Sequence, residues 1–241
     1  MSTVGAKLKR GLTNGAKTFC DVTGLPRYFI RQNMFELRMA GIRLYGLSPF
    51  RRMRIEKLER RPELRLIFGC GATRYPGWTG IDCFRGPAVD LLLDLRRQLP
   101  FRDSSVEHCY SEHFLEHLYP EEARFHLQEV RRVLKPGGVY RIVVPAGIHF
   151  AKKYLEGDLE FFSLAHPWEA RPLDGLYKIV NWNGQHRSLY DFSQFQYLAQ
   201  ETGFARAREC GANQSQVPTL CIDRSESQRM AESLYVELVK S

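Results

Sequence analysis

Short apolar runs separated by turn residues fill the middle of the chain, a pattern that predicts buried strands. The first run stops at Gly69, and the last is closed by Pro145. Their short length and their Gly, Pro and Asp boundaries are typical of strands in a buried sheet. Five strands are predicted, at residues 64–68, 79–83, 89–93, 106–110 and 139–144.

The clearest helix lies between the fourth and fifth predicted strands. It begins near Pro120, with Glu121 and Glu122 in the first turn, where carboxylates complement the helix dipole. Apolar residues then recur at helical spacing, and the Pro-Gly-Gly sequence at 136–138 ends the helix. Strand, helix and strand in this order predict a βαβ unit, and therefore an α/β protein with a largely parallel sheet.

Residues 146–186 break this rhythm with seven aromatic side chains and with turn signals at Pro172 and Gly175. An insertion of this length in a compact domain is typical of a lid or a binding loop. After it, the pattern predicts a helix at 191–202 that Gly203 ends. Strands are predicted at 204–209 and 219–223, and an amphipathic helix is predicted at 225–240.

Charge divides the chain into two parts. The net charge is +8, but residues 1–61 hold 14 Lys and Arg against 4 Asp and Glu, which is +10 and leaves −2 for the rest. We therefore expect a basic N-terminal helical extension at 1–61, with residues 1–20 mobile, and a separate α/β domain at 62–241. The extension is suited to nucleic acid, anionic lipid or a phosphorylated substrate, or it is a solvated helical surface.

Composition narrows the class of protein. Hydrophobic residues make up 44% and charged residues 26%, as in soluble globular proteins. No run approaches the ~20 apolar residues of a membrane span, and no apolar segment follows the N-terminal lysines as in a secretory signal. The six cysteines fit neither a zinc motif nor a disulfide framework, which favours reduced thiols and a cytoplasmic location.

The residues that end the strands carry the candidate chemistry, because ligands of open parallel sheets bind at the carboxyl ends of the strands. The first strand ends in the turn 69–71, Gly-Cys-Gly, whose glycines let a ligand approach the backbone, or which is simply a tight turn. The second ends in Asp82, which is placed to accept ribose hydroxyls or is an ordinary turn aspartate. The third ends in Asp94, followed by Leu95, a pair suited to an adenine ring.

Five motifs then occur in a recognisable order. They are Gly69-Cys70-Gly71, Gly77-Trp78-Thr79-Gly80-Ile81-Asp82, Asp94 with Leu99-Pro100-Phe101, Ser111-Glu112-His113-Phe114-Leu115-Glu116-His117, and Glu129-Val130-Arg131-Arg132-Val133-Leu134-Lys135-Pro136-Gly137-Gly138. This series resembles the class I methyltransferases that depend on S-adenosyl-L-methionine (SAM). It is most similar to the methyltransferase type 11 group, over residues 64–145 with a weaker similarity at 186–204.

The resemblance implies a fold and a set of roles. The fold is a Rossmann-like three-layer α/β/α sandwich, with a mostly parallel seven-stranded sheet and an antiparallel last strand. The cofactor is SAM. The resemblance assigns the methionine and ribose part of SAM to Gly69, Cys70 and Gly71, the ribose hydroxyls to Asp82, the adenine to Asp94 and Leu95, and the surroundings of the methyl group to Ser111, Glu112 and His113.

One departure from the family concerns the connection after the first strand. Only residues 72–78 separate Gly71 from Thr79, whereas a helical crossover needs about ten or more residues. We therefore expect a loop where most class I enzymes have a helix. The basic helices of residues 26–61 are then expected to cover the sheet face that this helix would have covered.

Histidines are the candidate catalytic residues. His186 follows the aromatic insertion, and either acts as a general base for an acceptor hydroxyl or pins the lid to the next helix. His113 is a second candidate base. His113 and His117 are four residues apart, a spacing that binds zinc on a helix, but no third ligand can be named from the spacing, so no metal site is predicted.

The function predicted is methyl transfer from SAM to a hydroxyl or amine of a small molecule or sugar. The alternatives are an RNA or protein acceptor drawn in by the basic segment, or a non-catalytic SAM-binding module. An NAD-dependent enzyme is disfavoured because residues 69–71 lack the third glycine and the following helix of the dinucleotide fingerprint. The sequence leaves the acceptor atom and the oligomeric state open.

Overall fold

The structure is a computed structural model that describes residues 20–241. The chain forms two compact units, Met1–Leu47 and Ser48–Ser241, and each is described by itself. The first contains helix α2 (Arg27–Tyr45). The expectation of mobility at residues 1–20 falls, apart from Cys20, outside the described residues.

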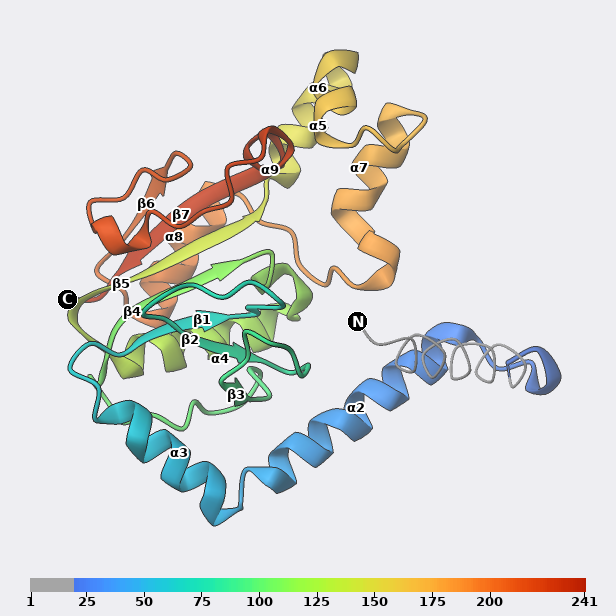
Figure 1. Ribbon diagram of the computed structural model, residues 1–241. Helices are drawn as coiled ribbons and strands as arrows, with labels where there is room; N and C mark the ends of the chain where they lie inside the picture. Colours follow the sequence, from blue (N-terminus) through green and yellow to red (C-terminus); the bar gives the residue numbers. More distant parts are fainter. Residues whose placement is uncertain (1–19) are drawn as a thin grey trace. The chain divides into compact units, whose positions relative to one another are not determined.

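The second unit is built on a seven-stranded sheet with strand order β3-β2-β1-β4-β5-β7-β6 (Figure 1). Strands β1 to β5 run parallel to one another, and β7 is antiparallel to both β5 and β6. The predicted seven-stranded, mostly parallel sheet is therefore confirmed. The strands are β1 (Arg65–Phe68), β2 (Thr79–Asp82), β3 (Leu91–Leu92), β4 (Val106–Glu112), β5 (Leu134–Pro145), β6 (Arg206–Cys210) and β7 (Ser233–Val239).

Helices connect these strands and form the insertion predicted as a lid. In Figure 1, α5, α6 and α7 of that insertion gather beyond one end of the sheet, where the parallel strands finish. The helices of this unit are α3 (Pro49–Glu59), α4 (Pro120–Val133), α5 (Gly147–Leu155), α6 (Leu159–Ala165), α7 (Pro172–Asn181), α8 (Phe192–Thr202) and α9 (Ser227–Glu232), and the 3-10 turns are η1 (Leu115–His117), η2 (Trp182–Gly184) and η3 (Pro218–Leu220).

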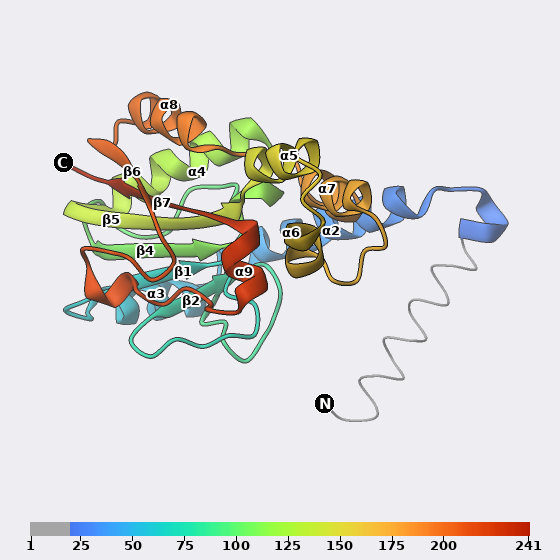
Figure 2. The same ribbon diagram turned by 90° about the horizontal axis from the view of Figure 1, so that it is seen from above.

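One face of the sheet is covered by α4 and α8 (Figure 2). Alternate strand residues such as Phe68 and Tyr140 point to this face and pack with Leu127 of α4 and Phe195 of α8 in one buried cluster. Helix α3 adds Leu58 to the same cluster. Each helix is held by its apolar side, as the periodicity of α4 and α8 predicted.

The opposite face is covered by loops. Ile67 and Tyr110 point to this side and pack with Trp78 of the β1–β2 loop and Leu220 of η3. The loop predicted in place of the first crossover helix is confirmed. Because this helix is absent, fewer helices cover this face of the sheet. The connections from β1 to β2 and from β2 to β3 are too short to hold a crossover helix of ordinary length.

Helix α3 does not cover this face. The expectation that residues 26–61 would cover it in place of the missing helix is therefore wrong for α3. Leu58 faces the α4 side because the connection from β3 to β4 also lacks a helix and leaves that side open. An ion pair of 3.1 Å between Glu59 and Arg102 of that connection fixes the end of α3.

The segment at 225–240 corrects a second expectation. It is predicted as one amphipathic helix, yet only Ser227–Glu232 is helical and the rest is strand β7. Leu234, Val236 and Leu238 pack on the α4 side, while Tyr235 faces the loop side. This two-residue alternation is a strand pattern. The strand predicted at 219–223 is also absent there, where the structure has η3 and an extended segment.

A buried charge cluster ties β5 to β7 and to that extended segment. The Arg141 side chain is 0% exposed and pairs with Asp223 and with Glu237 of β7, whose side chains are 1% and 2% exposed. Arg141 also donates to the carbonyl oxygen of Gly211 at 2.8 Å. Buried charges are tolerated only when they are paired and hydrogen-bonded, so this cluster specifies how the loop side is closed.

Candidate active site

The turn after β1 has the backbone shape that its glycines allow. Gly69 has φ of 65° and Gly71 has φ of 56°, both in the left-handed region. A Cβ on Gly69 would lie 3.0 Å from the Cβ of Phe114. A Cβ on Gly71 would meet no described atom within 4 Å. The backbone at Gly71 therefore borders open space, as expected of a strand end that receives a ligand.

Asp82 is joined directly to this turn. One carboxylate oxygen accepts from the Gly71 N–H at 3.0 Å, and the other accepts from the Phe84 N–H at 2.9 Å. The two strand ends that the sequence singled out are thus brought together. The Cys70 thiol instead packs on the loop side, 3.7 Å from the Ala88 carbonyl oxygen. Burial raises the pKa of this thiol to about 11.

Asp94 has a partner that the sequence analysis missed. Arg96 donates to its two carboxylate oxygens at 2.8 and 3.1 Å. The adjacent Leu95 is buried, and its carbonyl oxygen accepts from Nδ1 of His126 at 3.1 Å. An adenine amine would therefore meet a carboxylate that an arginine already neutralises. The arginine two residues along the sequence was the available signal.

A cavity of about 460 Å³ opens beside Gly69, at the ends of β1, β4 and β5. The lid contributes Trp168, Ile179 and Trp182 to its wall, and the segment that leads into β7 contributes Arg224, Arg229 and Glu232. The residues from the strand ends and their loops include Glu112, His113, Glu116, His117 and His186. Four of the predicted site residues therefore meet at one cavity, namely Gly69, Glu112, His113 and His186.

The side chain of Ser111, another predicted site residue, points away from the cavity. Its hydroxyl is 2.8 Å from the Tyr140 hydroxyl in the fully buried core on the α4 side. The neighbouring Glu112 belongs to the cavity, where it accepts from the Tyr110 hydroxyl at 2.9 Å and pairs with Arg224 at 2.8 Å. Successive residues of a strand point to opposite faces, so Ser111 and Glu112 cannot share one side.

His113 has a constrained position at the end of β4. Its φ is 50°, its Nε2 lies 3.0 Å from the Ser233 hydroxyl, and its Nδ1 lies 3.4 Å from a carboxylate oxygen of Glu116. Burial lowers the pKa of this imidazole well below its usual value, and the charges of Arg229 and Arg224 add to the effect. His113 is therefore neutral at neutral pH, as a general base must be.

His186 lies at the junction of the lid and the cavity. Its Nδ1 is 2.6 Å from the carbonyl oxygen of Ile179 in α7, and its ring stacks on Trp182 with a 13° interplanar angle. The ring of His117 is 5.1 Å away, edge to face. Burial lowers the pKa of both histidines. His186 thus lines the cavity and contacts α7 of the insertion, so its position is compatible with both alternatives, and its role as a base stays a prediction.

Glu116 is the cavity residue that the sequence analysis did not select. The whole residue is 1% exposed, and neither carboxylate oxygen accepts a hydrogen bond from any described residue. Burial raises the pKa of this carboxyl to about 8. One of its oxygens and one nitrogen from each of His117 and His186 lie within 4.8 Å of one another. This group contains His117 but not His113, so it differs from the His113–His117 pair that the sequence spacing suggested.

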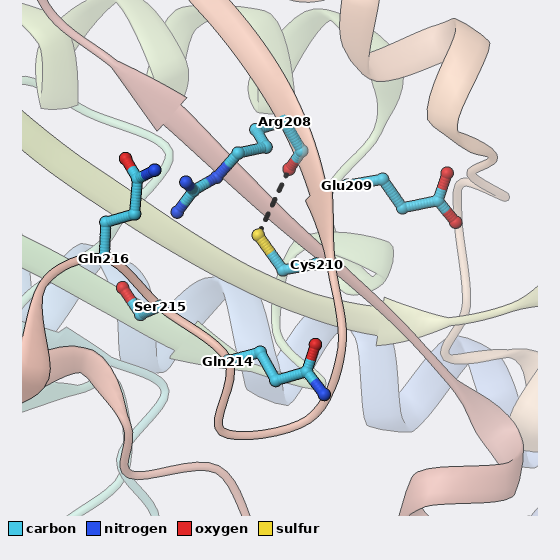
Figure 3. A pocket seen from close by; sticks show the side chains of 6 residues that line it. All are labelled: Arg208, Glu209, Cys210, Gln214, Ser215 and Gln216. Atoms are coloured by element: carbon cyan, nitrogen blue, oxygen red, sulfur yellow. Dashed lines mark hydrogen bonds between the residues drawn. The ribbon is translucent and has the colours of Figure 1, made fainter.

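A second hollow, of about 330 Å³, lies at the sheet edge (Figure 3). Edge strand β6 and the following loop line it, and Figure 3 shows the Cys210 thiol turned back toward the Arg208 carbonyl oxygen, 3.7 Å away. Arg208 is itself paired with Glu237. None of the predicted site residues lines this hollow.

The family comparison agrees with the sheet. Residues 81–142 match a family described as methyltransferase domain. Over these residues the chain is therefore similar to methyltransferase domains, and the strand order with an antiparallel β7 agrees with that similarity. The matched residues contain Asp82, Asp94 and the whole segment from Ser111 to His117.

Three solved structures are similar to this chain in fold. The Haloferax volcanii putative methyltransferase, in complex with its activator Trm112, has 16% identity, covers 77% of this chain and 88% of that one, and has a TM-score of 0.43. The Haemonchus contortus phosphoethanolamine N-methyltransferase 2 with SAM has 14% identity, covers 80% of this chain and 53% of that one, and has a TM-score of 0.43. The Burkholderia thailandensis 1,6-didemethyltoxoflavin-N1-methyltransferase, with 1,6-didemethyltoxoflavin and S-adenosylhomocysteine bound, has 12% identity, covers 88% of this chain and 87% of that one, and has a TM-score of 0.44.

No curated protein has a matching sequence. Among the described residues, no helix combines the length and the apolar character that a membrane crossing requires.

Proposed function

We propose that the protein transfers the methyl group of SAM to a hydroxyl or amine of a small molecule or sugar. The observation that carries this proposal is the cavity of about 460 Å³ beside Gly69. Its volume lies in the range of small-molecule sites, and it is bounded by strand ends on one side and by the lid on the other. A site of this shape suits a compact acceptor better than an extended polymer.

The cofactor is proposed to lie across the ends of β1, β2 and β3. The open space at Gly71 receives its ribose and methionine part, and Asp82 accepts the ribose hydroxyls. Asp94 and Leu95 hold the adenine. Each carboxylate oxygen has two lone pairs, so Asp94 can accept an amine while it keeps its bonds to Arg96.

The chemistry needs alignment and the removal of one proton. The acceptor oxygen attacks the methyl carbon of the sulfonium, the new C–O bond forms as the C–S bond breaks, and S-adenosylhomocysteine leaves as a neutral thioether. Holding donor and acceptor in line supplies much of the rate. The hydroxyl proton passes to a neutral imidazole of the cavity, His113 or His186.

The lining of the cavity supports a polar acceptor with a flat face. Trp168 and Trp182 present aromatic rings from the lid, and such rings stack on sugars and on planar heterocycles. Arg224 and Arg229 line the same cavity and are paired with Glu112 and Glu232. This mixture of rings and paired charges favours an acceptor rich in hydroxyl groups.

Calorimetric titration of the full chain with SAM and S-adenosylhomocysteine tests the cofactor part of this proposal. We expect wild-type protein to bind both, and Asp82→Asn to weaken binding at least tenfold. The matched control is Asp103→Asn. The Asp103 side chain is 77% exposed, is not among the predicted site residues, and pairs at the surface with Arg132. Absence of binding by the wild type, or equal binding by Asp82→Asn, contradicts the proposal.

The second candidate acceptor is RNA or protein, supported by the charge of +10 in residues 1–61. An RNA substrate would be held by phosphate contacts, so its methylation would fall steeply as salt is added, and RNA would be retarded in a gel. Methylation of small acceptors that is insensitive to salt supports the first candidate. Binding of S-adenosylhomocysteine with no transfer to any acceptor class supports a non-catalytic module.

A further inference from the structure

Glu116 is buried in the cavity wall without a hydrogen-bond partner among the described residues. Its residue is 1% exposed, and neither of its oxygens accepts a hydrogen bond from the described part of the chain. A buried carboxyl group that loses water without gaining a partner destabilises the fold, so such a group requires an explanation. Since it lies on the cavity wall, a bound group is the natural partner.

Two imidazoles beside Glu116 are already oriented as ligands. Nδ1 of His117 lies 3.2 Å from the Gln185 carbonyl oxygen, and Nδ1 of His186 lies 2.6 Å from the Ile179 carbonyl oxygen. A carbonyl can only accept, so in each ring Nδ1 carries the proton and Nε2 carries the lone pair. Ligand histidines are commonly fixed in this way, with the outer nitrogen bonded to a backbone carbonyl.

The charges around the cavity leave room for a cation. The two arginines of its wall are each paired, Arg224 with Glu112 at 2.8 Å and Arg229 with Glu232 at 2.6 Å. Among the described residues, Glu116 has no ion pair with a lysine or an arginine, and His113 is the one ionisable neighbour within 4.0 Å of its carboxylate. A bound cation would therefore supply the opposite charge that no lysine or arginine of the described residues gives to the Glu116 carboxyl group.

We infer that Glu116, His117 and His186 bind one divalent transition-metal ion such as zinc. One ligand atom from each lies within 4.8 Å of the others. Two imidazoles and one carboxylate, with further positions open, are the ligand set of catalytic zinc sites and of other first-row metal sites. Ligands about 2.1 Å from an ion lie about 3.4 Å apart, so the three side chains need only close by small rotations.

The open coordination positions would face the cavity, and their use rests on the proposed function. An acceptor hydroxyl bound to the ion becomes more acidic, which prepares it to attack the methyl group. His186 then serves as a ligand rather than as the base. The proton is left to His113, whose Nδ1 already lies 3.4 Å from Glu116.

Cobalt(II) titration of metal-stripped full-length protein tests the site, because cobalt replaces zinc and reports its ligands by visible absorption. We expect one equivalent per chain, with no thiolate charge-transfer band. Glu116→Gln, His117→Ala and His186→Ala should each lower cobalt affinity at least about a hundredfold. His149→Ala, an exposed histidine of α5, is the matched control and should bind as the wild type does.

Circular dichroism separates loss of the site from loss of the fold. Glu116→Gln keeps the size of the side chain, so it should stay folded, and cobalt should raise the melting temperature of the wild type but not of this variant. The inference is overturned if the wild type binds no cobalt, if His186→Ala binds it equally, or if a thiolate band places it on cysteine. Calorimetry with S-adenosylhomocysteine on the same samples reports separately on the proposed function.

Discussion

Replacing Gly71 by alanine separates a cost in folding from a cost in cofactor binding. Gly71 has φ of 56°, where an L-residue is disfavoured by about 1–2 kcal/mol. Its Cβ would meet no described atom within 4 Å, so no packing cost is added. We expect the free energy of unfolding to fall by about 1–2 kcal/mol, and the melting temperature by about 2–8 °C for a domain of this size.

The matched control is Gly157→Ala. Gly157 follows α5, has φ of 69°, and its Cβ would likewise meet no described atom within 4 Å. The two variants should therefore melt alike, as followed by circular dichroism. Only Gly71→Ala places a methyl group where the ribose and methionine part of SAM is proposed to lie, so it alone should bind S-adenosylhomocysteine at least tenfold more weakly, a loss of about 1.4 kcal/mol.

Two results would refute this reasoning. Equal affinity of Gly71→Ala and wild type for S-adenosylhomocysteine would mean that the cofactor does not pass the turn after β1. A loss of stability far larger for Gly71→Ala than for Gly157→Ala would mean that the space beside Gly71 is filled in the folded protein. Weak binding by both variants would point to a general loosening instead of a local clash.

Three further predictions concern stability and the lid. Arg141→Met leaves the buried carboxylate of Asp223 without its arginine and leaves Glu237 with Arg208 alone, so chemical denaturation should show a loss of about 3–5 kcal/mol in the free energy of unfolding, and a loss under 1 kcal/mol would contradict the pairing. Burial lowers the pKa of His126 to about 4, below the usual 6.5. Between these two pH values only the unfolded chain binds a proton at this histidine, so the free energy of unfolding should fall by about 3 kcal/mol as the pH drops from 6.5 to 4. Denaturation of His126→Gln at pH 7 and pH 4.5 should show a smaller decrease than the wild type, and an equal decrease would contradict this origin. Trp182→Ala removes the ring stacked on His186 and should raise KM for the acceptor more than it lowers kcat, a split that steady-state kinetics measures.

The sheet was largely predictable because its signals are local. Runs such as 64–68 and 139–144 are short and apolar and end at Gly or Pro, and the helix from Pro120 has apolar residues at helical spacing. Strand β7 was missed for a physical reason. Its sequence from Ser233 to Val239 follows a helical turn and carries Glu237, a charge that marks a surface position unless a buried arginine across the sheet neutralises it.

The site divides in the same way. That Gly71 and Asp82 lie side by side could be predicted, because the glycine turn follows β1, Asp82 ends β2, and strand ends of a parallel sheet meet at one edge. The roles of Glu116 and Ser111 depend on which way each side chain points, and a turn such as η1 does not reveal this in advance. Arg96 was missed although it is close in sequence, because pairing with Asp94 depends on the turn that bends it back.

The position of β7 has a consequence for how the protein is made. β7 follows β6 in the sequence but lies between β5 and β6, and its first pairing partner, β5, is about ninety residues earlier. A ribosome therefore releases both flanking strands with unpaired edges, which are prone to aggregate, and with Arg141 still lacking one carboxylate. The sheet closes in one late, long-range step, so a nascent chain that stalls before β7 is a natural substrate for chaperones.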